Sequence, residues 1–203
     1  MEAAPTTLGS GARVESTARR SRFHSMPSRL SRTLPILIFN EPHKVRWALS
    51  TRADKLALPI ADRHYNRQKI GSPQFVPPGR CIVLWCERAL WVTSWPYAEY
   101  TRHRWGGAWI NSLFRNEGAG LSSELILEAI AATRWYWETP PLGLITFVDA
   151  EKVRHKRDPG RCYRKAGFVH VGFTESGLHA FQLIPERMPA AEAPLGINLT
   201  LPL

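Results

Sequence analysis

A glycine-rich turn carries the clearest chemical pattern in the chain. Arg115-Asn116-Glu117-Gly118-Ala119-Gly120 joins an apolar, strand-like run to a helical one. Glycines let the backbone turn tightly and approach a ligand closely. The N–H groups that open the next helix have no partner within it, and the helix dipole favours an anion beside them. The pattern therefore predicts a pyrophosphate-binding turn; the alternative is a glycine-rich connection without a ligand.

Groups that could exchange protons occur at two other places. Asp62-Arg63-His64-Tyr65 lies in a predicted short helix, where adjacent His and Tyr cannot share a face unless the helix ends there. Asp149 follows an apolar run, and ligands gather at strand ends in open α/β sheets. A carboxylate there can act as a general base or hold an amine or a metal. For Asp149 the structural alternative is a cap or a partner for Arg154 or Arg157. For His64 the structural alternative is a hydrogen bond within the fold.

Two basic segments could contact a nucleic acid. The first lies between residues 151 and 161, where clustered cations could grip a phosphate backbone without reading its sequence. The second, Tyr97 to Trp105, interleaves arginine with rings that could stack on an extruded or single-stranded base. The alternatives are a solvated loop that contacts at most a CoA 3′-phosphate, and a covering loop whose rings pack on the sheet. The predicted nucleic-acid contacts are Arg102, Arg104, Lys152, Arg154, Lys156, Arg157 and Arg161.

The composition agrees with an anionic partner and a reducing environment. Lys and Arg number 27 against 17 Asp and Glu, and the formal net charge is +10. Such an excess of positive charge favours an anionic partner: nucleic acid, a CoA phosphate or a membrane surface. The alternative is a basic, solvated surface without a specific partner. The three cysteines show no CxxC spacing, which disfavours a disulfide framework and a cysteine-rich zinc site. No apolar run approaches the roughly 20 residues that span a bilayer, so we expect no membrane partner and a cytoplasmic chain.

The two ends of the chain differ from its middle. Residues 1–33 are rich in Ser, Thr, Ala, Gly and Arg and poor in large apolar side chains, so we expect a disordered basic tail. Two interpretations of this tail are open: a basic arm that contacts an acidic polymer, or an upstream extension of a chain that starts at Met26. Residues 186–203 are expected to form a loose C-terminal tail, which leaves 34–185 as the folded domain.

Periodicity places the chemical groups on alternating strands and helices. Apolar runs predict strands, and the repeat of Leu121, Leu125, Ala129 and Ala132 predicts an amphipathic helix. Such an alternation favours a mixed α/β layer fold over a bundle or a sandwich. The predicted strands cover 34–39, 81–85, 89–95, 108–114, 142–148, 168–173 and 178–184; the predicted helices cover 60–68, 121–135 and 161–166, with looser helical spacing over 43–58.

Two motifs resemble those of the GNAT superfamily of acyltransferases. R-x-x-G-x-G at 115–120 resembles that family's CoA-binding motif, and residues 163–168 resemble the Y-x-x-x-G-F ending of its last motif. The resemblance implies a GNAT-like mixed, mostly antiparallel central sheet flanked by helices, and acetyl-CoA or a related acyl donor. It implies that the amides of 116–121 hold the pyrophosphate and that Tyr163 protonates the leaving thiolate. The implied donor-binding residues are Arg115, Asn116, Glu117, Gly118, Ala119, Gly120, Leu121, Ser122 and Ser123, with a hydroxyl contact from Ser122 or Ser123.

Within that superfamily, the chain is most similar to the divergent Mom-type DNA-modification proteins of phages. That branch places a carbamoylmethyl group on adenine N6 in DNA. By position, the resemblance implies a donor-side role for Ser123. Iron is a further implied cofactor, for which His64 and Asp149 could contribute ligands. The loop from Glu151 to Gly160 departs from the branch because it is longer and strongly basic here. The implied catalytic residues are His64, Tyr65, Asp149 and Tyr163.

Three hypotheses for the activity follow. The first is a GNAT-fold enzyme that modifies an amine of a DNA nucleobase, with Asp149 orienting or deprotonating the acceptor and the basic loop holding the strand. The second is an acetyl-CoA-dependent N-acetyltransferase that acts on a small amine or a peptide. The third is a GNAT-fold nucleic-acid-binding protein without catalysis.

Overall fold

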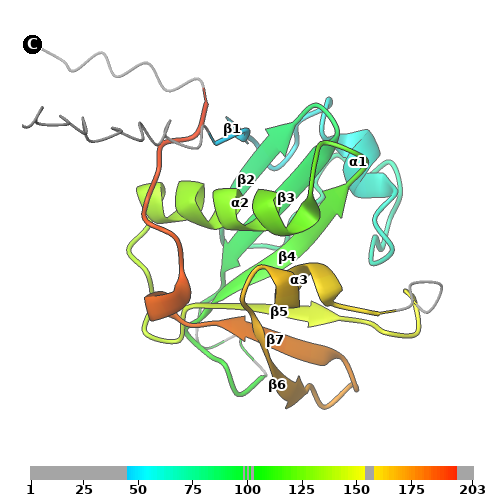
Figure 1. The fold of residues 1–203 in the computed structure, drawn as a ribbon. Helices are drawn as coiled ribbons and strands as arrows, with labels where there is room; N and C mark the ends of the chain where they lie inside the picture. The colour runs from blue at the N-terminus through cyan, green and yellow to red at the C-terminus, as the bar shows by residue number, and fades with distance from the viewer. Residues whose placement is uncertain (1–44, 98, 100, 102, 154–157, 196–203) are drawn as a thin grey trace, which may run out of the picture. The chain divides into compact units, whose positions relative to one another are not determined.

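The computed structural model describes residues 45–97, 99, 101, 103–153 and 158–195 (Figure 1). The predicted strand at 34–39, the predicted tail at 1–33 and residues 196–203 lie outside these ranges. Among the described residues, no helix is long and apolar enough to cross a membrane.

Seven strands of the described chain form one open sheet, in the order β1-β2-β3-β4-β5-β7-β6 (Figure 1). Every neighbouring pair is antiparallel except β4 and β5, which run parallel. The prediction of a mixed, mostly antiparallel α/β fold is therefore confirmed. The strands are β1 (Ala48–Ser50), β2 (Arg80–Cys86), β3 (Ala89–Trp95), β4 (Trp109–Asn116), β5 (Leu144–Val148), β6 (Val169–Phe173) and β7 (His179–Leu183).

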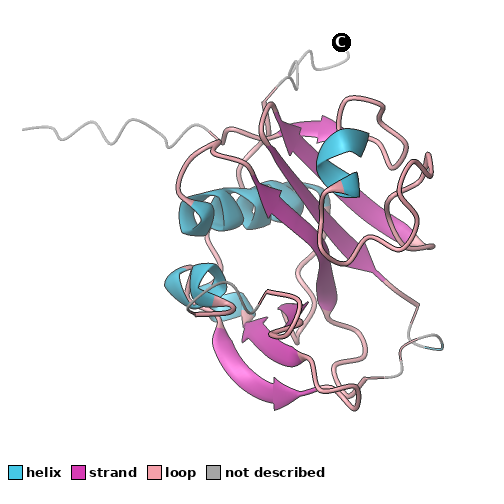
Figure 2. Cartoon of the chain, turned by 90° about the vertical axis from the view of Figure 1, so that its right-hand side faces the viewer, coloured by secondary structure: helices cyan, strands magenta, loops and turns pink. Residues whose placement is uncertain are grey.

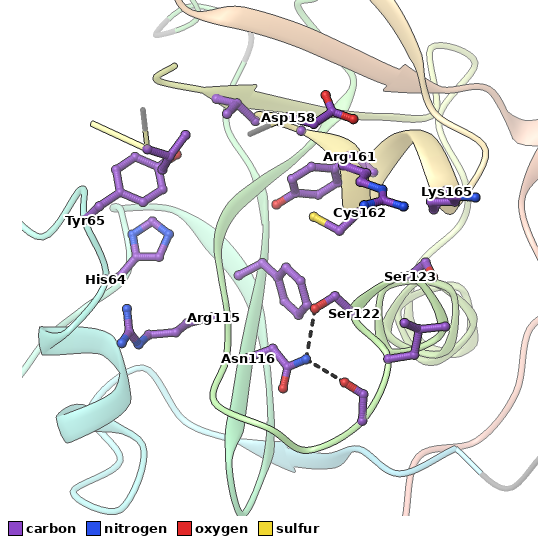
Figure 3. A pocket seen from close by; sticks show the side chains of 17 residues that line it. His64, Tyr65, Arg115, Asn116, Ser122, Ser123, Asp158, Arg161, Cys162 and Lys165 are labelled. Atoms are coloured by element: carbon purple, nitrogen blue, oxygen red, sulfur yellow. Dashed lines mark hydrogen bonds between the residues drawn. The ribbon is translucent and has the colours of Figure 1, made fainter. Parts of the chain in front are cut away.

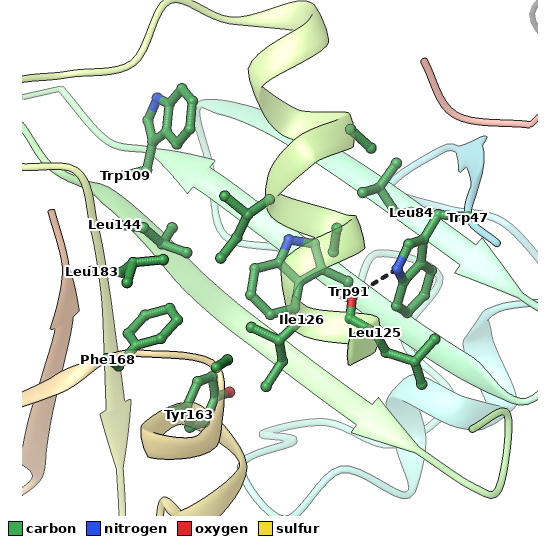
Figure 4. Packing of buried hydrophobic residues seen from close by; sticks show 14 of the residues in the cluster. Trp47, Leu84, Trp91, Trp109, Leu125, Ile126, Leu144, Tyr163, Phe168 and Leu183 are labelled. Atoms are coloured by element: carbon green, nitrogen blue, oxygen red, sulfur yellow. Dashed lines mark hydrogen bonds between the residues drawn. The ribbon is translucent and has the colours of Figure 1, made fainter. Parts of the chain in front are cut away.

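Helices cover both faces of this sheet (Figure 2). On one face, α2 (Ser122–Tyr136) and α3 (Arg161–Lys165) pack in the main core (Figure 4). The apolar side chains of α2 recur every three or four residues and are buried, as a helical period requires. On the other face, α1 (Leu58–Asp62) packs over side chains that alternate along the strands with those of the main core. The main core includes Trp47, Leu84, Trp91, Trp109, Leu125, Ile126, Leu144, Tyr163, Phe168, Phe181 and Leu183.

The helical spacing expected over residues 43–58 is wrong. The segment contains strand β1 and turns, and α1 begins only at Leu58. Val45 and Trp47 are buried, whereas Leu49 and Leu56 remain exposed, so the apolar side chains of this segment do not form one buried helical face. The indole of Trp47 donates a hydrogen bond to the carbonyl of Leu125 at 2.9 Å (Figure 4), a tertiary contact that a local pattern cannot reveal.

The segment that follows β7 is attached to the domain as far as Leu195, contrary to the loose tail expected. A 3₁₀ turn at Pro185–Arg187 leads to Met188, which is buried. The backbone N–H of Leu195 donates to the carbonyl of Trp47 at 2.7 Å. Composition gave no sign of this attachment because much of it is made by backbone groups, which every residue carries.

β4 and β5 stay paired over only a short stretch. Residues 109–111 pair with residues 144–146. Beyond that point β4 continues along β3, whereas β5 continues along β7. Ser112 has no counterpart on β3 where the β3–β4 register shifts, and such a bulge bends the strand that carries it. The two parallel strands therefore diverge (Figure 1), and we refer to the opening as the β4–β5 fork.

Gly160 sets the start of α3 at this fork. Its φ is 78°, in the left-handed region, and it precedes the first residue of the helix. A Cβ at this position would lie 2.5 Å from the ring of Phe181 in the main core. Glycine is therefore required here both by the backbone conformation and by the close approach to the core.

We expect Gly160→Ala to lower the free energy of unfolding by about 2 to 4 kcal/mol, because a left-handed alanine and an overpacked core each contribute. Gly177→Ala is the matched control, since Gly177 has a φ of 80° and open space where its Cβ would lie. That variant should lose only about 1 kcal/mol. Urea denaturation measures both, and equal losses would show that the Phe181 contact does not constrain α3.

Candidate functional site

A cavity of about 1030 Å³ lies in the β4–β5 fork (Figure 3). A smaller hollow of about 20 Å³ adjoins it beside Ser112 and Thr146. His64, Tyr65, Phe114 and Tyr163 line both spaces, so they mark the place where the two meet. The large cavity is lined by His64, Tyr65, Phe114, Arg115, Asn116, Gly120, Leu121, Ser122, Ser123, Val148, Val153, Asp158, Gly160, Arg161, Cys162, Tyr163 and Lys165.

The side chain of Asn116 folds the glycine-rich turn. Its Oδ1 accepts the N–H groups of Gly118 and Ala119 at 3.0 and 2.9 Å. Its Nδ2 donates to the carbonyl of Gly120 and the hydroxyl of Ser122 at 2.8 and 2.9 Å (Figure 3). The amides of 118 and 119 are thus occupied within the turn, contrary to the expectation that all amides of 116–121 face an anion. The N–H groups that remain available to an anion are those at the start of α2, since the first turn of a helix has no internal acceptors.

Arg46 supports the turn from the side of β1. Its guanidinium pairs with Glu128 of α2 at 2.6 Å and donates to the carbonyl of Ala119 at 3.4 Å. A Cβ on Gly120 would lie 2.2 Å from this guanidinium, so a larger residue there would displace the Arg46 side chain. The turn is therefore enclosed between α2 and a residue far away in sequence.

Glu117 connects the glycine-rich turn to the turn after α1. Its carboxylate pairs with Arg63 and with Arg115, each at 2.6 Å. The guanidinium of Arg63, and then that of Arg115, lowers the pKa of Glu117 from its ordinary 4.5 to about 2. Glu117, Gly118 and Ala119 do not line the cavity, so this part of the predicted binding motif shapes the site without facing it.

His64 and Tyr65 both face the cavity because α1 ends before them. The helix stops at Asp62, whereas the sequence predicted it to reach residue 68. The carboxylate of Asp62 accepts hydrogen bonds from Arg67 at 2.7 Å and from the N–H of Gly71 at 2.9 Å, which folds the following residues into turns. The His64 and Tyr65 rings lie 4.5 Å apart between centroids. Burial raises the pKa of the Tyr65 phenol.

Tyr163 joins the core to the cavity. Its ring packs edge-on to Phe168 and Phe114, and its hydroxyl donates to Oδ1 of Asn111 at 2.7 Å. Burial raises the pKa of Tyr163 well above its ordinary value, so the phenol holds its proton at neutral pH. The Nδ2 of Asn111 in turn donates to the carbonyls of Val92 and Leu113 at 3.1 and 2.9 Å. These two bonds fix the backbone of β4 at its bulge.

Asp149 behaves as a cap in this structure. Its Oδ1 accepts the backbone N–H groups of Glu151 and Lys152, each at 3.1 Å. The ammonium of Lys152 lies 3.8 Å from the other carboxylate oxygen. Asp149 does not line either hollow, so the geometry matches the structural alternative for this residue. Its other proposed partners, Arg154 and Arg157, lie outside the described residues.

The predicted nucleic-acid contacts divide into three groups. Arg161 lines the cavity. Arg104 and Lys152 are engaged within the chain, since the Arg104 guanidinium lies 4.5 Å from the Trp105 ring and donates to the carbonyl of Val171. Arg102, Arg154, Lys156 and Arg157 lie outside the described residues.

Several cavity residues were not predicted from the sequence: Phe114, Val148, Val153, Asp158, Gly160, Cys162 and Lys165. Their exposure to the cavity depends on the divergence of β4 from β5, which no local pattern reveals. One signal was available, because Arg161 and Lys165 are four residues apart and so share one side of α3.

The residues proposed for iron do not fit a metal. Among the described residues, no group of three or more His, Cys, Asp and Glu side chains could hold a metal ion. Oδ1 of Asp149 already accepts two backbone hydrogen bonds. His64 lines the cavity, whereas Asp149 does not.

Comparisons of the chain with models of protein families, with curated proteins and with solved structures each found no match.

We expect Asn111→Leu to lower the free energy of unfolding by about 3 to 5 kcal/mol. The substitution leaves the Tyr163 hydroxyl and the carbonyls of Val92 and Leu113 without this hydrogen-bond partner in the core. Tyr163→Phe, which removes one hydroxyl and leaves the bonds of Nδ2 in place, should lose only about 1 kcal/mol. Urea denaturation separates the two. Similar losses would mean that the bonds of Asn111 to β3 and β4 contribute little.

The ion pairs of Glu117 should make part of the stability depend on pH. A folded-state pKa below the ordinary value stabilises the fold above about pH 4.5, and this contribution is lost as pH falls toward 2. The melting temperature of the wild type should therefore exceed that of Glu117→Gln at pH 6, and the difference should shrink between pH 4.5 and 2. In an Arg63→Gln, Arg115→Gln background the difference should vanish; its persistence there would contradict the assignment.

Proposed function

We propose that this chain is a GNAT-like group transferase that moves an acyl-type group from a CoA thioester to an amine. The observation that carries the proposal is the meeting of the two hollows at His64, Tyr65 and Tyr163. The larger hollow reaches the start of α2, where an anion is favoured. The smaller one has room for about one water molecule beside the same side chains. A donor in the larger hollow would therefore have its reactive end beside His64, Tyr65 and Tyr163.

The fold supports the GNAT-like part of the proposal. β4, the glycine-rich turn and α2 follow one another directly, so the turn lies at one arm of the fork. Beyond residue 111, the edge of β4 that faces β5 has no ladder partner on that strand. Unpaired strand groups can bind an extended ligand that carries amides, as a pantetheine arm does. The donor would then lie with its phosphates at α2 and its thioester near Tyr163.

The chemistry at the meeting point is a direct transfer. The acceptor amine attacks the thioester carbonyl, the new C–N bond forms, and the C–S bond breaks. The leaving thiolate takes a proton from Tyr163, whose raised pKa keeps the phenol protonated until then. For this step the hydroxyl turns from Oδ1 of Asn111 to the sulfur. His64, in the wall shared by both hollows, takes the proton that the amine loses.

The favoured acceptor is an amine of a DNA nucleobase, adenine N6 by the Mom-type resemblance. The formal net charge of +10 supports a polyanionic partner. An N-acetyltransferase for a small amine is the second candidate, because Arg104 and Lys152 make contacts within the chain instead of extending toward a partner. A nucleic-acid-binding protein without catalysis is the third candidate, and Tyr163→Phe would leave its function intact.

The donor site is tested by calorimetry with acetyl-CoA. Ser123→Asp places a carboxylate in the cavity wall at the start of α2, where it favours the helix but repels phosphate. We expect it to weaken acetyl-CoA binding about ten-fold or more while the melting temperature is kept. Ser123→Ala is the control without charge. A wild-type chain that binds no CoA compound would refute the proposal.

The acceptor is tested by mass spectrometry of nucleosides from DNA of cells that express the chain. A new adenine adduct that disappears in Ser123→Asp would support DNA as the acceptor. Acetylation of a small amine by the purified chain, without any adduct in DNA, would support the second candidate instead.

A further inference from the structure

Two cationic side chains of α3 line the donor cavity. Arg161 and Lys165 are four residues apart, so they lie on one side of the helix, while Tyr163 and Ala166 face the core. The cavity wall that they form faces the start of α2, which carries Ser122 and Ser123 (Figure 3). The cavity therefore has positive groups on α3 as well as the positive end of α2.

The third cation of α3 shows what distinguishes this pair. Arg164 forms an ion pair with Asp158, lies 5.5 Å from the ring of Phe181 and does not line the cavity. Arg161 and Lys165 have no acidic side chain within 4.0 Å in the described part of the chain. Asp158 also lines the cavity, but its carboxylate is paired with Arg164. The two like charges of Arg161 and Lys165 repel each other, and an anion bound between them would relieve this.

We propose that Arg161 and Lys165 form a second phosphate subsite, which takes the ribose 3′-phosphate of the CoA-type donor. This inference rests on the proposed function. The start of α2 takes one anionic group, the pyrophosphate, and the donor carries one more, the 3′-phosphate. A guanidinium can bind phosphate through two parallel hydrogen bonds, and an ammonium adds a compact charge beside it. The chain would therefore select CoA over its dephosphorylated form.

The alternative occupant is a phosphate of the DNA backbone, for which the sequence alone proposed Arg161. A duplex is too wide to enter a cavity of about 1030 Å³ between α2, α3 and the two strands. Arg161 and Lys165 are exposed to solvent and also line this cavity. A small donor that enters the cavity can contact them and the start of α2 together, which a duplex outside the cavity cannot do.

The test compares acetyl-CoA with acetyl-3′-dephospho-CoA by calorimetry. The wild type should bind acetyl-CoA about ten-fold or more tightly than the dephosphorylated donor, the range of a charge-assisted hydrogen bond. In Arg161→Gln, Lys165→Gln this preference should collapse to about one-fold, through loss of acetyl-CoA affinity alone. Arg164→Gln, a matched loss of one α3 cation outside the cavity, should keep the preference.

Each other outcome has a distinct meaning. Tight but equal binding of both donors by the wild type would overturn the 3′-phosphate subsite and leave the proposed function standing. A preference that survives in the double variant, together with weaker duplex DNA binding, would overturn it in favour of a DNA contact. Absence of binding to either donor would refute the proposed function itself.

Discussion

The parallel pairing of β4 with β5, limited to a few residues, is the constraint on which the site depends. Parallel neighbours cannot be joined by a tight turn, so the chain crosses over the sheet, and α2 is that crossover. A crossover begins where the first strand ends, which brings the start of α2 to the opening of the fork. The cavity, the helix terminus and the divergent strands are thus three results of one pairing pattern.

Asn111 fixes where the divergence begins. It is the last β4 residue paired with β5, and its amide bonds to β3, to β4 beyond the bulge and to Tyr163 on α3. A buried amide with its donors and acceptor engaged sets one geometry, because any shift leaves a polar group without a partner. The same side chain therefore positions the backbone of the fork and the phenol that faces it.

The sequence predicts the parts of the molecule that repeat locally. The β2–β3 hairpin, α2 and the two last strands follow from apolar runs, periodicity and glycine positions, and the structure confirms them. The glycine-rich turn was located correctly, and most of its flanking residues line the cavity. The assignment of every turn amide to an anion was wrong, because the competing acceptor is the side chain of Asn116 within the same turn.

Long-range contacts explain what the sequence could not predict. Trp47 is buried by α2, so the segment around it forms a strand and not the helix that its spacing indicated. Asp149 lies at a strand end, as expected, but its Oδ1 accepts the amides of Glu151 and Lys152, which depends on how the chain turns there. In the sequence, Lys165 is one residue of the segment that resembles the Y-x-x-x-G-F ending, and no site role was predicted for it. It lines the cavity only because the two strands diverge at the fork.

The pairing of Arg46 with Glu128 has a consequence for how the protein is made. The two residues are 82 positions apart, so during synthesis the guanidinium leaves the ribosome long before its partner on α2. Tyr163 and the Leu195 contact with Trp47 come later still. A nascent chain therefore cannot hold the glycine-rich turn in its final shape, and ligand affinity should emerge only once nearly the whole chain has been released.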